Sequence, residues 1–539
     1  MMPAPSISAN ISPDLLSQKQ LVDALLAPGY FSGTSKLEET HISWVLLTGR
    51  DTYKIKKSVD LGFLDFSTLA ARRFFCTEEL RLNRRLAPNL YLDVIAIGGS
   101  PEQPILGGEP AIEYAVHMRR FARSCMMDRR LESGYITPQH IDKLAALIAL
   151  FHISLPPAAA DSPLCATTAI QTAVVENFAQ LPQLFSTPDD LALLSKVREA
   201  SAQAFVVGEP LFRQRANAGC VRECHGDLHL GNIVLLDDTP TPFDGIEFST
   251  ALRWIDVISE ISFPVMDLLQ RGHPPLAWCL LNAYLEITGD YQGCGVLRFY
   301  LAYRAMVRAK ITAIRVSQRG VAKAKRKFKL CRSYLNLAHD CLSRRCPAII
   351  ITHGLPGCGK STFAQIALER LGAICIRSDV ERKRLSGLTA LADSKLLVNA
   401  DIYSSEATQR TYKRLRELAH DVIAAGFPVI VDAAFLRYAE RESFRALAKE
   451  MTIPFVIASL QTDSTVLAER LVQRSRRGND ASEADVSVMQ KLQQVQQPLR
   501  EEELKTAVTF INNRDVDALF DTGGWKSLEA CLAKNDDVY

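Results

Sequence analysis

Apolar residues in the first part of the chain follow alternating and helical patterns, which predict a β-rich lobe followed by a helical lobe. Apolar side chains at helical spacing predict a helix over residues 14–27, and a break follows at Pro28-Gly29. Two apolar runs, 41–48 and 52–59, flank the tight turn Gly49-Arg50-Asp51 and predict a pair of strands. The other elements predicted in this part are a helix over 69–86, a strand over 111–118, and helices over 138–153 and 189–206.

From residue 347 onward, short apolar runs alternate with helical patterns. A long helical region runs to about Ala425, is interrupted near Ser386-Gly387-Leu388, and is capped by Gly426. Buried strands that alternate with helices are typical of a parallel sheet with both faces covered. The five predicted strands are 347–353, 373–376, 428–433, 455–460 and 507–511.

Size and composition indicate a soluble protein of more than one domain. The chain has 539 residues, too many for one hydrophobic core, and we expect two domains, 1–340 and 346–539. No signal peptide is predicted over 1–20, and no apolar run has the roughly 18 residues that a transmembrane helix needs, so no membrane partner is expected. Although Cys220 and Cys224 are close, no second Cys or His pair completes a zinc site. Reduced thiols in a cytoplasmic protein fit best, and the oligomeric state stays open.

A glycine-rich loop stands between the predicted strand 347–353 and the helical pattern that begins at Phe363. The segment Gly354–Thr362 reads G-x-x-x-x-G-K-[ST], and strand, loop and helix form the context that this Walker A motif requires. Its glycines let backbone N–H groups turn toward phosphate oxygens, and the helix N-terminus adds partial positive charge. We expect Lys360 to reach the β- and γ-phosphates of ATP and Ser361 to hold Mg²⁺. The expected nucleotide-binding residues are Gly354, Gly357, Gly359, Lys360, Ser361 and Thr362.

Two aspartates follow predicted strands of this sheet, at the strand ends where ligands bind in parallel sheets. Asp432 is expected to act on Mg²⁺ through water, as a Walker B carboxylate does. Asp379 is a candidate base that deprotonates a substrate hydroxyl; alternatively, it caps a helix. Further on, Arg470 and Arg474 lie four residues apart on a predicted helix. They are expected to clamp phosphates, with a solvated charged face as the alternative.

A second phosphotransfer pattern lies well before the glycine-rich loop. Asp227 and Asn232 have the H-x-D-x-x-x-x-N spacing, in which a carboxylate accepts the proton of the attacking hydroxyl and an amide ligates Mg²⁺. A hairpin is predicted next, with strands over 233–236 and 243–248. Asp244 and Glu247 on the returning strand would supply a second carboxylate to a metal between the two strands.

Two lysines share one face of the strand predicted over 52–59. A period of two places Lys54 and Lys56 together, with Tyr53 and Ile55 on the other face. Such lysines are usually solvated and matter to function only if a carboxylate meets them. The helix over 69–86 offers Glu78 and Glu79 as partners, and Glu79 is favoured. The sequence alone does not establish which glutamate pairs with a lysine, or whether that lysine is Lys54 or Lys56.

Residues 304–345 form a basic stretch in which Asp340 is the only acidic residue. Apolar residues at helical spacing indicate that at least its first half is an amphipathic helix. A solvated helical face is one interpretation, and a surface for a polyanion such as RNA is the other. The formal net charge of +3 is too small to argue for a nucleic-acid partner by itself.

The catalytic pattern at 225–232 resembles that of the aminoglycoside phosphotransferase and choline-kinase group, a branch of the protein-kinase-like fold. The resemblance extends over residues from about 40 to 335. Glu247 falls where the family usually has a metal-binding aspartate, and Asp244 is the substitute candidate. The roles that the resemblance implies are catalytic base for Asp227, Mg²⁺ ligand for Asn232, and phosphate contact for Lys54 paired with Glu79.

The C-terminal part, from about 347 to 515, resembles the small P-loop kinases, such as polynucleotide kinase, zeta toxin, and gluconate and chloramphenicol kinases. This resemblance implies that Asp379 activates a hydroxyl and that the arginines from Arg470 onward form a lid. The pairing of the two parts resembles bacterial bifunctional aminoglycoside phosphotransferase and ATP-binding proteins.

We therefore expect an α/β and α+β protein of two domains, a protein-kinase-like fold followed by a P-loop parallel sheet. Each would transfer the γ-phosphate of ATP, with Mg²⁺, to a hydroxyl group of a small molecule that the sequence does not identify. The alternative is a P-loop kinase that acts on or binds RNA ends or a nucleotide sugar, with the N-terminal domain as a regulatory nucleotide-binding pseudokinase.

Overall fold

The chain forms two units whose segments alternate along the sequence. The first comprises residues 1–140, 155–169 and 216–260, and the second comprises 141–154, 170–215 and 261–539. The computed structural model describes residues 13–62, 64–159, 161–179, 181–185, 187–317, 324–390, 404–477, 486–513 and 523–533. Among the described helices, none combines the length and apolar character needed to cross a bilayer. The domain boundary between 340 and 346 stays a prediction.

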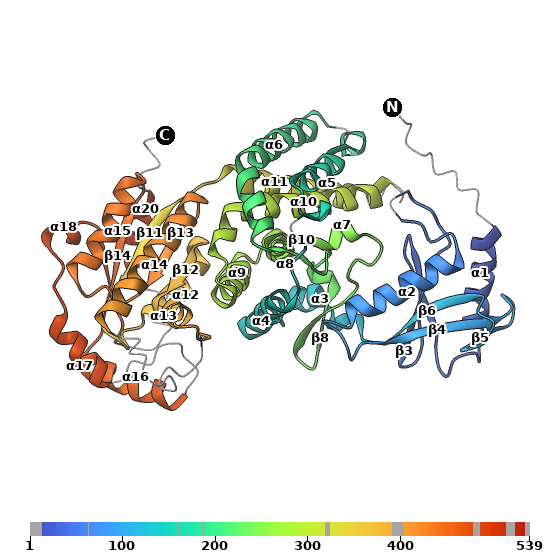
Figure 1. Ribbon diagram of the computed structural model, residues 1–539, viewed down its shortest axis with the longest axis horizontal. Coiled ribbons are helices and arrows are strands. Elements are labelled where there is room, and N and C mark those ends of the chain that lie inside the picture. Colours follow the sequence, from blue (N-terminus) through green and yellow to red (C-terminus); the bar gives the residue numbers. More distant parts are fainter. Residues whose placement is uncertain are drawn as a thin grey trace. The chain divides into compact units, whose positions relative to one another are not determined.

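A six-stranded antiparallel sheet forms the N-terminal lobe of the first unit, with strand order β1-β2-β3-β6-β4-β5 (Figure 1). Its strands are β1 Lys36–Glu39, β2 Ser43–Leu47, β3 Asp51–Lys56, β4 Tyr91–Gly99, β5 Pro104–Leu106 and β6 Glu113–Arg119. Helix α1, Pro13–Leu25, packs Val22 and Leu25 against Ile55 on one face of the sheet. Helix α2, Leu69–Asn83, covers the other face, where Cys76 packs near Val116. The alternation predicted for the lysine-bearing strand is confirmed, because its lysines face α2.

The remaining segments of the first unit form two small sheets and short helices. These elements are η1 Arg123–Cys125, α3 Met127–Glu132, η2 Pro163–Cys165, β7 Val221–Glu223, η4 Leu230–Asn232, β8 Ile233–Leu236, β9 Thr239–Pro242, α7 Thr250–Arg253 and β10 Trp254–Asp256. Strand β7 pairs with β10, and β8 pairs with β9. The return strand predicted over 243–248 is wrong. Asp237 and Asp238 both have positive φ, at 48° and 55°, so the turn is tight and the returning strand ends at Pro242.

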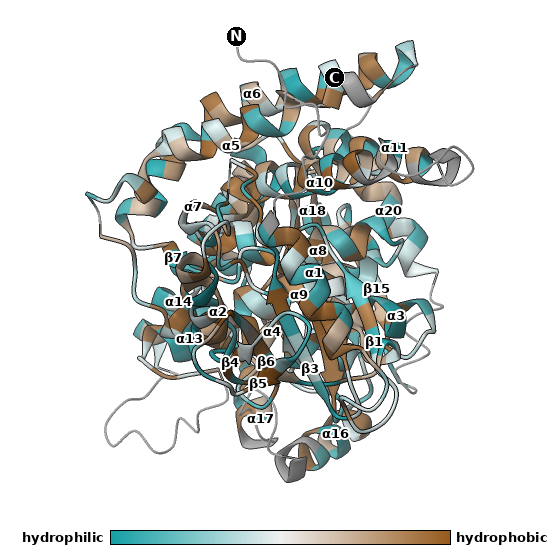
Figure 2. Ribbon diagram, turned by 90° about the vertical axis from the view of Figure 1, so that its right-hand side faces the viewer, coloured by the Kyte–Doolittle hydropathy of each residue, from teal (hydrophilic) through white to brown (hydrophobic). Residues whose placement is uncertain are grey.

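Helices dominate the segments of the second unit that precede the P-loop. They are α4 Pro138–Ser154, α5 Thr167–Ala179, η3 Leu181–Leu184, α6 Pro188–Asn217, α8 Val257–Gln270, α9 Pro274–Thr288, η5 Tyr291–Gly293, α10 Cys294–Ser317 and α11 Ala324–Ser343. Hydrophobic and hydrophilic residues interchange along α6, as Figure 2 shows by colour. The helices predicted over 138–153 and 189–206 are confirmed, and the amphipathic helix predicted in the basic stretch is α10.

The last part of the second unit is a parallel five-stranded sheet with strand order β12-β13-β11-β14-β15. Its strands are β11 Ala348–His353, β12 Ile374–Arg377, β13 Pro428–Asp432, β14 Phe455–Gln461 and β15 Ala507–Ile511. The helices are α12 Lys360–Leu371, α13 Ser378–Leu385, α14 Ser405–Ala424, α15 Tyr438–Glu450, α16 Ser464–Arg477, α17 Val486–Val495, α18 Glu501–Leu504 and α20 Gly524–Ala533. Every residue of β11 and β13 is buried, as expected for central strands covered on both faces. The predicted fold class is therefore confirmed here.

Candidate active sites

Glu79 of α2 joins the two lysines of β3. Its two carboxylate oxygens each accept a hydrogen bond, from Lys54 Nζ at 2.8 Å and from Lys56 Nζ at 2.8 Å. Glu78, one residue earlier, instead pairs with Arg81 at 2.8 Å on the helix surface. The structure thus selects Glu79 over Glu78 and gives both lysines to it. The phosphate-binding role of Lys54 and Glu79 stays a prediction.

The second partners of the two lysines differ in their access to solvent. The Lys56 side chain is fully buried and also binds Glu247, which is 4% exposed. Lys54 also binds Asp244, whose side chain is 46% exposed. Burial alone would lower the pKa of Lys54, but the neighbouring carboxylates, Asp244 first, outweigh burial and raise that pKa well above its usual value. Lys54 therefore keeps its proton, and it lies at the more exposed end of the cluster.

The predicted metal ligand Glu247 lies at the closed end of this cluster. Burial is the largest cause that raises the pKa of Glu247, and Lys56 opposes it. Lys56 keeps its proton, since the carboxylates of Glu247 and Glu79 outweigh the effect of burial on its pKa. Glu247 thus has a cation as its partner already, and its role as a metal ligand stays a prediction.

Asp227 and Asn232 are in direct contact, as their spacing predicted. Asn232 Nδ2 donates to both the backbone oxygen and Oδ2 of Asp227, each at 3.0 Å. Asn232 is 8% exposed, whereas the Asp227 side chain is 30% exposed and so open to a ligand. His229 Nε2 lies 3.6 Å from Asp227 Oδ2, and His229 Nδ1 accepts the Gly231 N–H. A carboxylate and an amide are therefore held together at the start of β8.

Buried groups fix the loop that carries Asp227. Glu260, fully buried, accepts the backbone N–H groups of His225 at 2.6 Å and Gly226 at 3.1 Å. His225 Nε2 donates to Phe243 O at 2.9 Å, and its Nδ1 accepts the Asp227 N–H at 3.3 Å. Burial lowers the pKa of His225 to about 4, so the ring is neutral and serves as both donor and acceptor. The loop is therefore held in place by the Glu260 carboxylate and the His225 ring, both of which are buried.

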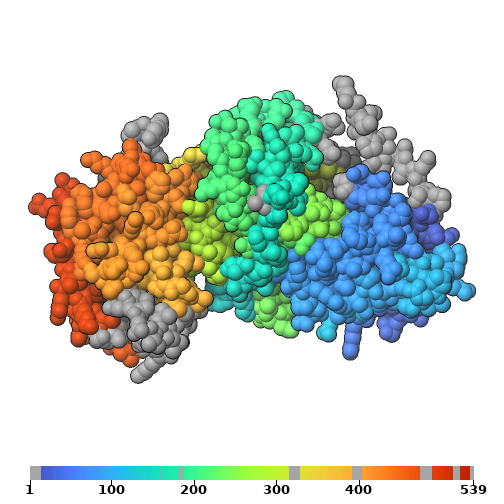
Figure 3. Space-filling view, viewed as in Figure 1, coloured from blue at the N-terminus to red at the C-terminus, as the bar shows by residue number. Residues whose placement is uncertain are grey.

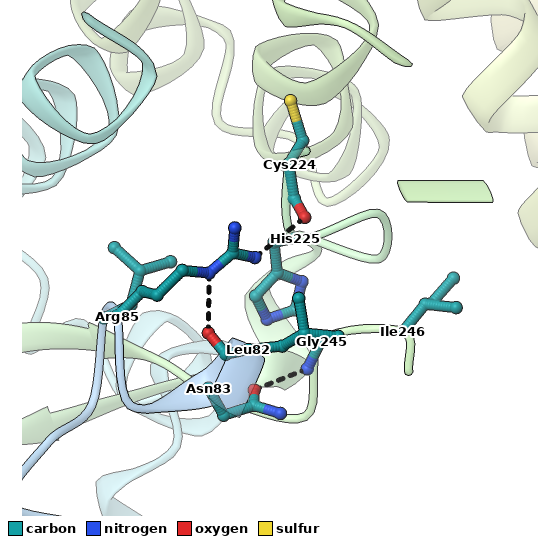
Figure 4. A pocket seen from close by; sticks show the side chains of 8 residues that line it. Leu82, Asn83, Arg85, Cys224, His225, Gly245 and Ile246 are labelled. Atoms are coloured by element: carbon teal, nitrogen blue, oxygen red, sulfur yellow. Dashed lines mark hydrogen bonds between the residues drawn. The ribbon is translucent and has the colours of Figure 1, made fainter. Parts of the chain in front are cut away.

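A small pocket behind this loop shows how α2 is connected to it (Figure 4). Its lining residues are Leu82, Asn83, Arg85, Leu86, Cys224, His225, Gly245 and Ile246. Asn83 Oδ1 accepts the Gly245 N–H at 2.7 Å, and Arg85 donates to the Leu82 and Cys224 backbone oxygens at 2.9 and 3.3 Å. The helix that bears Glu79 is thus bonded to the segment that bears Asp244 and Glu247.

The chain bends at Asp244, between β9 and Glu247. Asp244 has a φ of 62°, and its backbone N–H donates to the Tyr91 hydroxyl at 3.0 Å. In this left-handed conformation the residue leaves the strand direction, which carries its side chain to Lys54 and that of Glu247 to Lys56. The bend replaces the straight return strand predicted from the sequence.

The glycine-rich loop joins β11 to α12 in the predicted way. Gly354, Gly357 and Gly359 have φ values of 147°, 87° and 95°, which side chains other than glycine rarely adopt. A Cβ on Gly354 would also lie 2.7 Å from Leu460 O. Lys360 Nζ donates to the backbone oxygens of Gly354 and Leu355 at 3.1 and 2.9 Å, so the lysine lies over the loop. Thr362, the last residue of the motif, lies in the first turn of α12.

Ser361 and Asp432 meet beside the loop. Ser361 Oγ donates to Asp432 Oδ2 at 2.7 Å, and Asp432 is the last residue of β13, 6% exposed. Burial raises the pKa of Asp432, partly offset by Arg377 and Lys360. A hydroxyl and a carboxylate are oxygen ligands of the kind that Mg²⁺ takes, and their contact fits a magnesium site.

Asp379 lies in the first turn of α13, directly after β12. The capping residue of that helix is Arg377, and its side chain makes no capping bond. Asp379 is partly exposed and close enough to Asp432 to add to the rise in the pKa of Asp432. Both aspartates are therefore at the carboxyl edge of the sheet, and the role of Asp379 as a base stays a prediction.

Arg470 is bonded to the glycine-rich loop through one intermediate residue. Its Nη2 donates to Asn512 Oδ1 at 3.3 Å, and Asn512 Nδ2 donates to Cys358 O at 2.9 Å. Arg474 lies on the same helix, α16, but its side chain and residues 478–485 fall outside the described residues. The lid of arginines stays a prediction.

The basic stretch is not uniformly solvated. Arg304 is 4% exposed, with its guanidinium over the Phe263 ring, and Arg332 binds Asp190 at 2.6 Å. The side chains of 315–327 fall outside the described residues. Binding of RNA stays a prediction.

Sequence reasoning missed two acidic residues that contact the sites. Glu260 and Asp267 are the two charged residues of the largely apolar helix α8, and a charge in such a helix is a signal of a buried role. Glu286, at the end of α9, binds Arg377 at 3.2 Å and lies far from both motifs in the sequence. No local pattern distinguishes it from a surface glutamate.

Comparisons with known proteins give a matching family, relatives in mycobacteria and similar solved structures. Residues 349–499 match a family described as an AAA domain. Uncharacterised proteins of Mycobacterium tuberculosis H37Rv and Mycobacterium bovis are each 29% identical over 452 residues, 83% of this chain and 87% of each relative. Among solved structures, a choline/ethanolamine kinase family protein from Mesorhizobium loti is similar at 12% identity and a TM-score of 0.35, covering 60% of this chain and 99% of that one. A gluconokinase from Sinorhizobium meliloti 1021 is similar at 20% identity and a TM-score of 0.25, covering 36% of this chain and 96% of that one.

Each of the two parts of the chain has its own fold. The N-terminal part has a protein-kinase-like fold, in which a sheet lysine meets a helix glutamate beside an H-G-D loop. The C-terminal part has a P-loop kinase fold, in which a glycine-rich loop joins the central strand of a parallel sheet to a helix.

Proposed function

We propose that the chain is an ATP-dependent phosphotransferase with two separate nucleotide sites, each acting on a hydroxyl group of a small molecule. The observation that carries this proposal is the contact between Ser361 Oγ and Asp432 Oδ2 beside the glycine-rich loop. Those two groups and the loop are the parts that position Mg²⁺ and phosphates in phosphoryl transfer.

In the second unit, Lys360 and the N–H groups of its loop would hold the β- and γ-phosphates. Ser361 and Asp432 would hold Mg²⁺, which when bound neutralises charge on the phosphates. Asp379 would take the proton of the acceptor hydroxyl as its oxygen bonds to the γ-phosphorus and ADP leaves. Catalysis by positioning and charge neutralisation requires no covalent intermediate on the protein.

In the first unit, Asp227 would serve as the base, and Asn232 would be one metal ligand. Lys54 would contact the phosphates, since it is the partly exposed lysine of the cluster. Each of Asp244 and Glu247 is bound by a lysine, but Asp244 fits the second ligand position better because its carboxylate is half exposed whereas that of Glu247 is buried. The same Lys56–Glu247 pair favours the second candidate function, a regulatory first unit that binds nucleotide without transferring phosphate.

The test is phosphoryl transfer from γ-labelled ATP in Asp227→Asn and Lys360→Ala variants, with Glu132→Gln and Lys36→Ala as exposed controls. Acceptors would include aminoglycosides, sugars and 5′-hydroxyl oligonucleotides. We expect each site variant to abolish transfer to a different acceptor while the controls keep both activities. Transfer unchanged in Asp227→Asn, with nucleotide still bound, would establish the regulatory reading of the first unit. Transfer unchanged in Lys360→Ala would refute catalysis at the glycine-rich loop.

A further inference from the structure

Helix α9 pairs with the edge strand of the P-loop sheet through a side chain. Asn282 Nδ2 donates to Ala373 O at 3.0 Å, and Asn282 Oδ1 accepts the Cys375 N–H at 2.7 Å. The amide thereby bonds to β12 as a neighbouring strand would. Gly372 lies so close to Trp278 that a Cβ there would be 2.9 Å from the indole ring. In Figure 3 the yellow-green surface, which includes the α9 region, abuts the orange surface of the P-loop part of the same unit.

The C-terminal end of α9 is fastened to the same sheet. Arg384 of α13 donates to the backbone oxygens of Glu286 at 2.5 Å and of Ile287 at 3.4 Å. The last carbonyls of a helix have no partner within the helix, so a guanidinium there both caps the helix and fixes its place. Arg384 thus fixes the backbone of α9 at Glu286.

Glu286 reaches the magnesium carboxylate through Arg377, at the end of β12. Glu286 Oε1 accepts a hydrogen bond from Arg377 Nη1 at 3.2 Å, and Arg377 Nε lies 3.7 Å from Asp432 Oδ2. That same Asp432 oxygen accepts the Ser361 hydroxyl. The guanidinium is hydrogen-bonded to Glu286 and makes only a longer ion-pair contact with Asp432. Among the described carboxylates, Arg377 thus lies between Glu286, to which it is hydrogen-bonded, and Asp432, which is farther away.

We propose that Glu286 is a positioning residue of the P-loop site that holds Arg377 back from Asp432. A guanidinium that closed on Asp432 would compete with a divalent cation for the same oxygen, since both are attracted to one carboxylate. Glu286 lies on α9, outside residues 349–499, which match the family. The P-loop site would therefore depend on a helix that precedes the P-loop sheet in the sequence. The inference rests on the proposed roles of Ser361 and Asp432.

The experiment measures binding of a fluorescent, non-hydrolysable ATP analogue as Mg²⁺ is titrated, in the full chain. The signal lost in Lys360→Ala defines the P-loop component. In Glu286→Gln we expect the Mg²⁺ concentration for half-maximal binding to rise roughly three- to tenfold, the coupling expected within one salt-bridge network. In the double variant Glu286→Gln, Arg377→Gln the rise should disappear, because the competing cation is gone.

Two further variants separate this role from general packing. Asn282→Ala weakens the attachment of α9 without touching Arg377, and Glu450→Gln removes an exposed ion pair of similar length, with Arg416 at 3.3 Å. Both should keep the wild-type Mg²⁺ dependence. Three results would overturn the inference. They are a wild-type Mg²⁺ concentration for half-maximal binding in Glu286→Gln, a rise in that concentration that persists in the double variant, and a rise of equal size in Asn282→Ala. The readout is binding, so the two proposals can fail separately. If Glu286→Gln raises the Mg²⁺ requirement as expected but the chain transfers no phosphate, the proposed function is refuted and the role of Glu286 stands. A wild-type chain with no Lys360-dependent binding would refute both.

Discussion

Lys56 and Glu247 form an ion pair from which solvent is excluded, with side-chain exposures of 0% and 4%. Glu79 is the second carboxylate on the same ammonium group. Removing one member of a buried pair leaves an uncompensated charge, which costs far more than the pair contributes. In this cluster Lys56 therefore supports the fold, whereas Lys54, on the same strand face, is the lysine open to a ligand.

Replacement of the two lysines should separate stability from nucleotide binding. Lys56→Met leaves Glu79 and Glu247 short of a cation, and we expect a loss of about 3 kcal/mol in the stability of the first unit. Lys54→Met should weaken nucleotide binding by that unit about tenfold, because a charge-assisted bond to phosphate is lost. Urea unfolding followed by hydrogen exchange of peptides from β2 and β3 gives the first quantity, and nucleotide titration gives the second.

Lys36→Met serves as the control, since Lys36 is 66% exposed in its pair with Glu38 and its loss should change neither quantity. If Lys56→Met is as stable as the wild type, Lys56 does not support the fold. Equal loss of nucleotide binding in Lys54→Met and Lys56→Met would show that both lysines contribute equally to nucleotide binding.

Replacement of the two nearby carboxylates should separate metal binding from stability in the same way. Asp244→Asn is expected to raise the Mg²⁺ concentration needed for nucleotide binding by the first unit about tenfold, since it removes a charged oxygen ligand. Glu247→Gln should instead lower the stability of the unit by about 2 kcal/mol, because a partner of a buried ammonium is lost. Magnesium titrations and urea unfolding measure the two effects. A Glu247→Gln variant of wild-type stability with a raised Mg²⁺ requirement would restore Glu247 as the metal ligand.

The sequence predicted the parts of both sites that are local. Strand, glycine-rich loop and helix follow one another without interruption, and Asp227 and Asn232 are five residues apart. For such motifs the spacing itself fixes the geometry. The two-residue period of β3 likewise placed Lys54 and Lys56 on one face before their partners were known.

The remaining parts depend on backbone details and distant pairings. The bend at Asp244 requires a positive φ in a residue other than glycine, which no propensity predicts with certainty. The helix predicted for α2 contains both Glu78 and Glu79, and only its packing on the sheet decides which one faces the lysines. Glu286 meets Arg377 across segments with unrelated patterns. Such contacts are determined by tertiary packing and produce no periodic pattern in the sequence.

The buried His225 should make the first unit less stable in acid. Burial lowers its pKa from 6.5 to about 4, while Phe243 O and Asp244 oppose the shift. The unfolded chain takes up the proton near pH 6.5 but the folded chain only near pH 4, so stability falls as pH decreases through this window and levels off below it. The expected loss is about 2–3 kcal/mol. Urea unfolding at pH values from 7 to 4 should show it.

His225→Gln is the comparison for that pH dependence, because glutamine retains a donor for Phe243 O but does not titrate. The variant should be less stable at neutral pH and should lose less stability between pH 6.5 and 4 than the wild-type chain. Parallel pH profiles for the two proteins would mean that His225 does not titrate in this range. Carboxylates elsewhere contribute equally to both profiles and cancel in the difference.

The last prediction concerns Gly226, which precedes the candidate base. Its φ is 87°, and a Cβ there would lie 2.8 Å from Leu252 O, so Gly226→Ala meets both strain and a backbone clash. The control is Gly134→Ala, because Gly134 has a φ of 72° and no atom within 4 Å of the added carbon. We expect the control to lose about 1 kcal/mol and keep its activity, whereas Gly226→Ala should lose about 3 kcal/mol or more. Displacement of Asp227 should also reduce transfer by the first unit about a hundredfold at an unchanged KM for ATP. Thermal unfolding and initial rates check this, and equal losses in the two variants would show that the clash does not govern the loop.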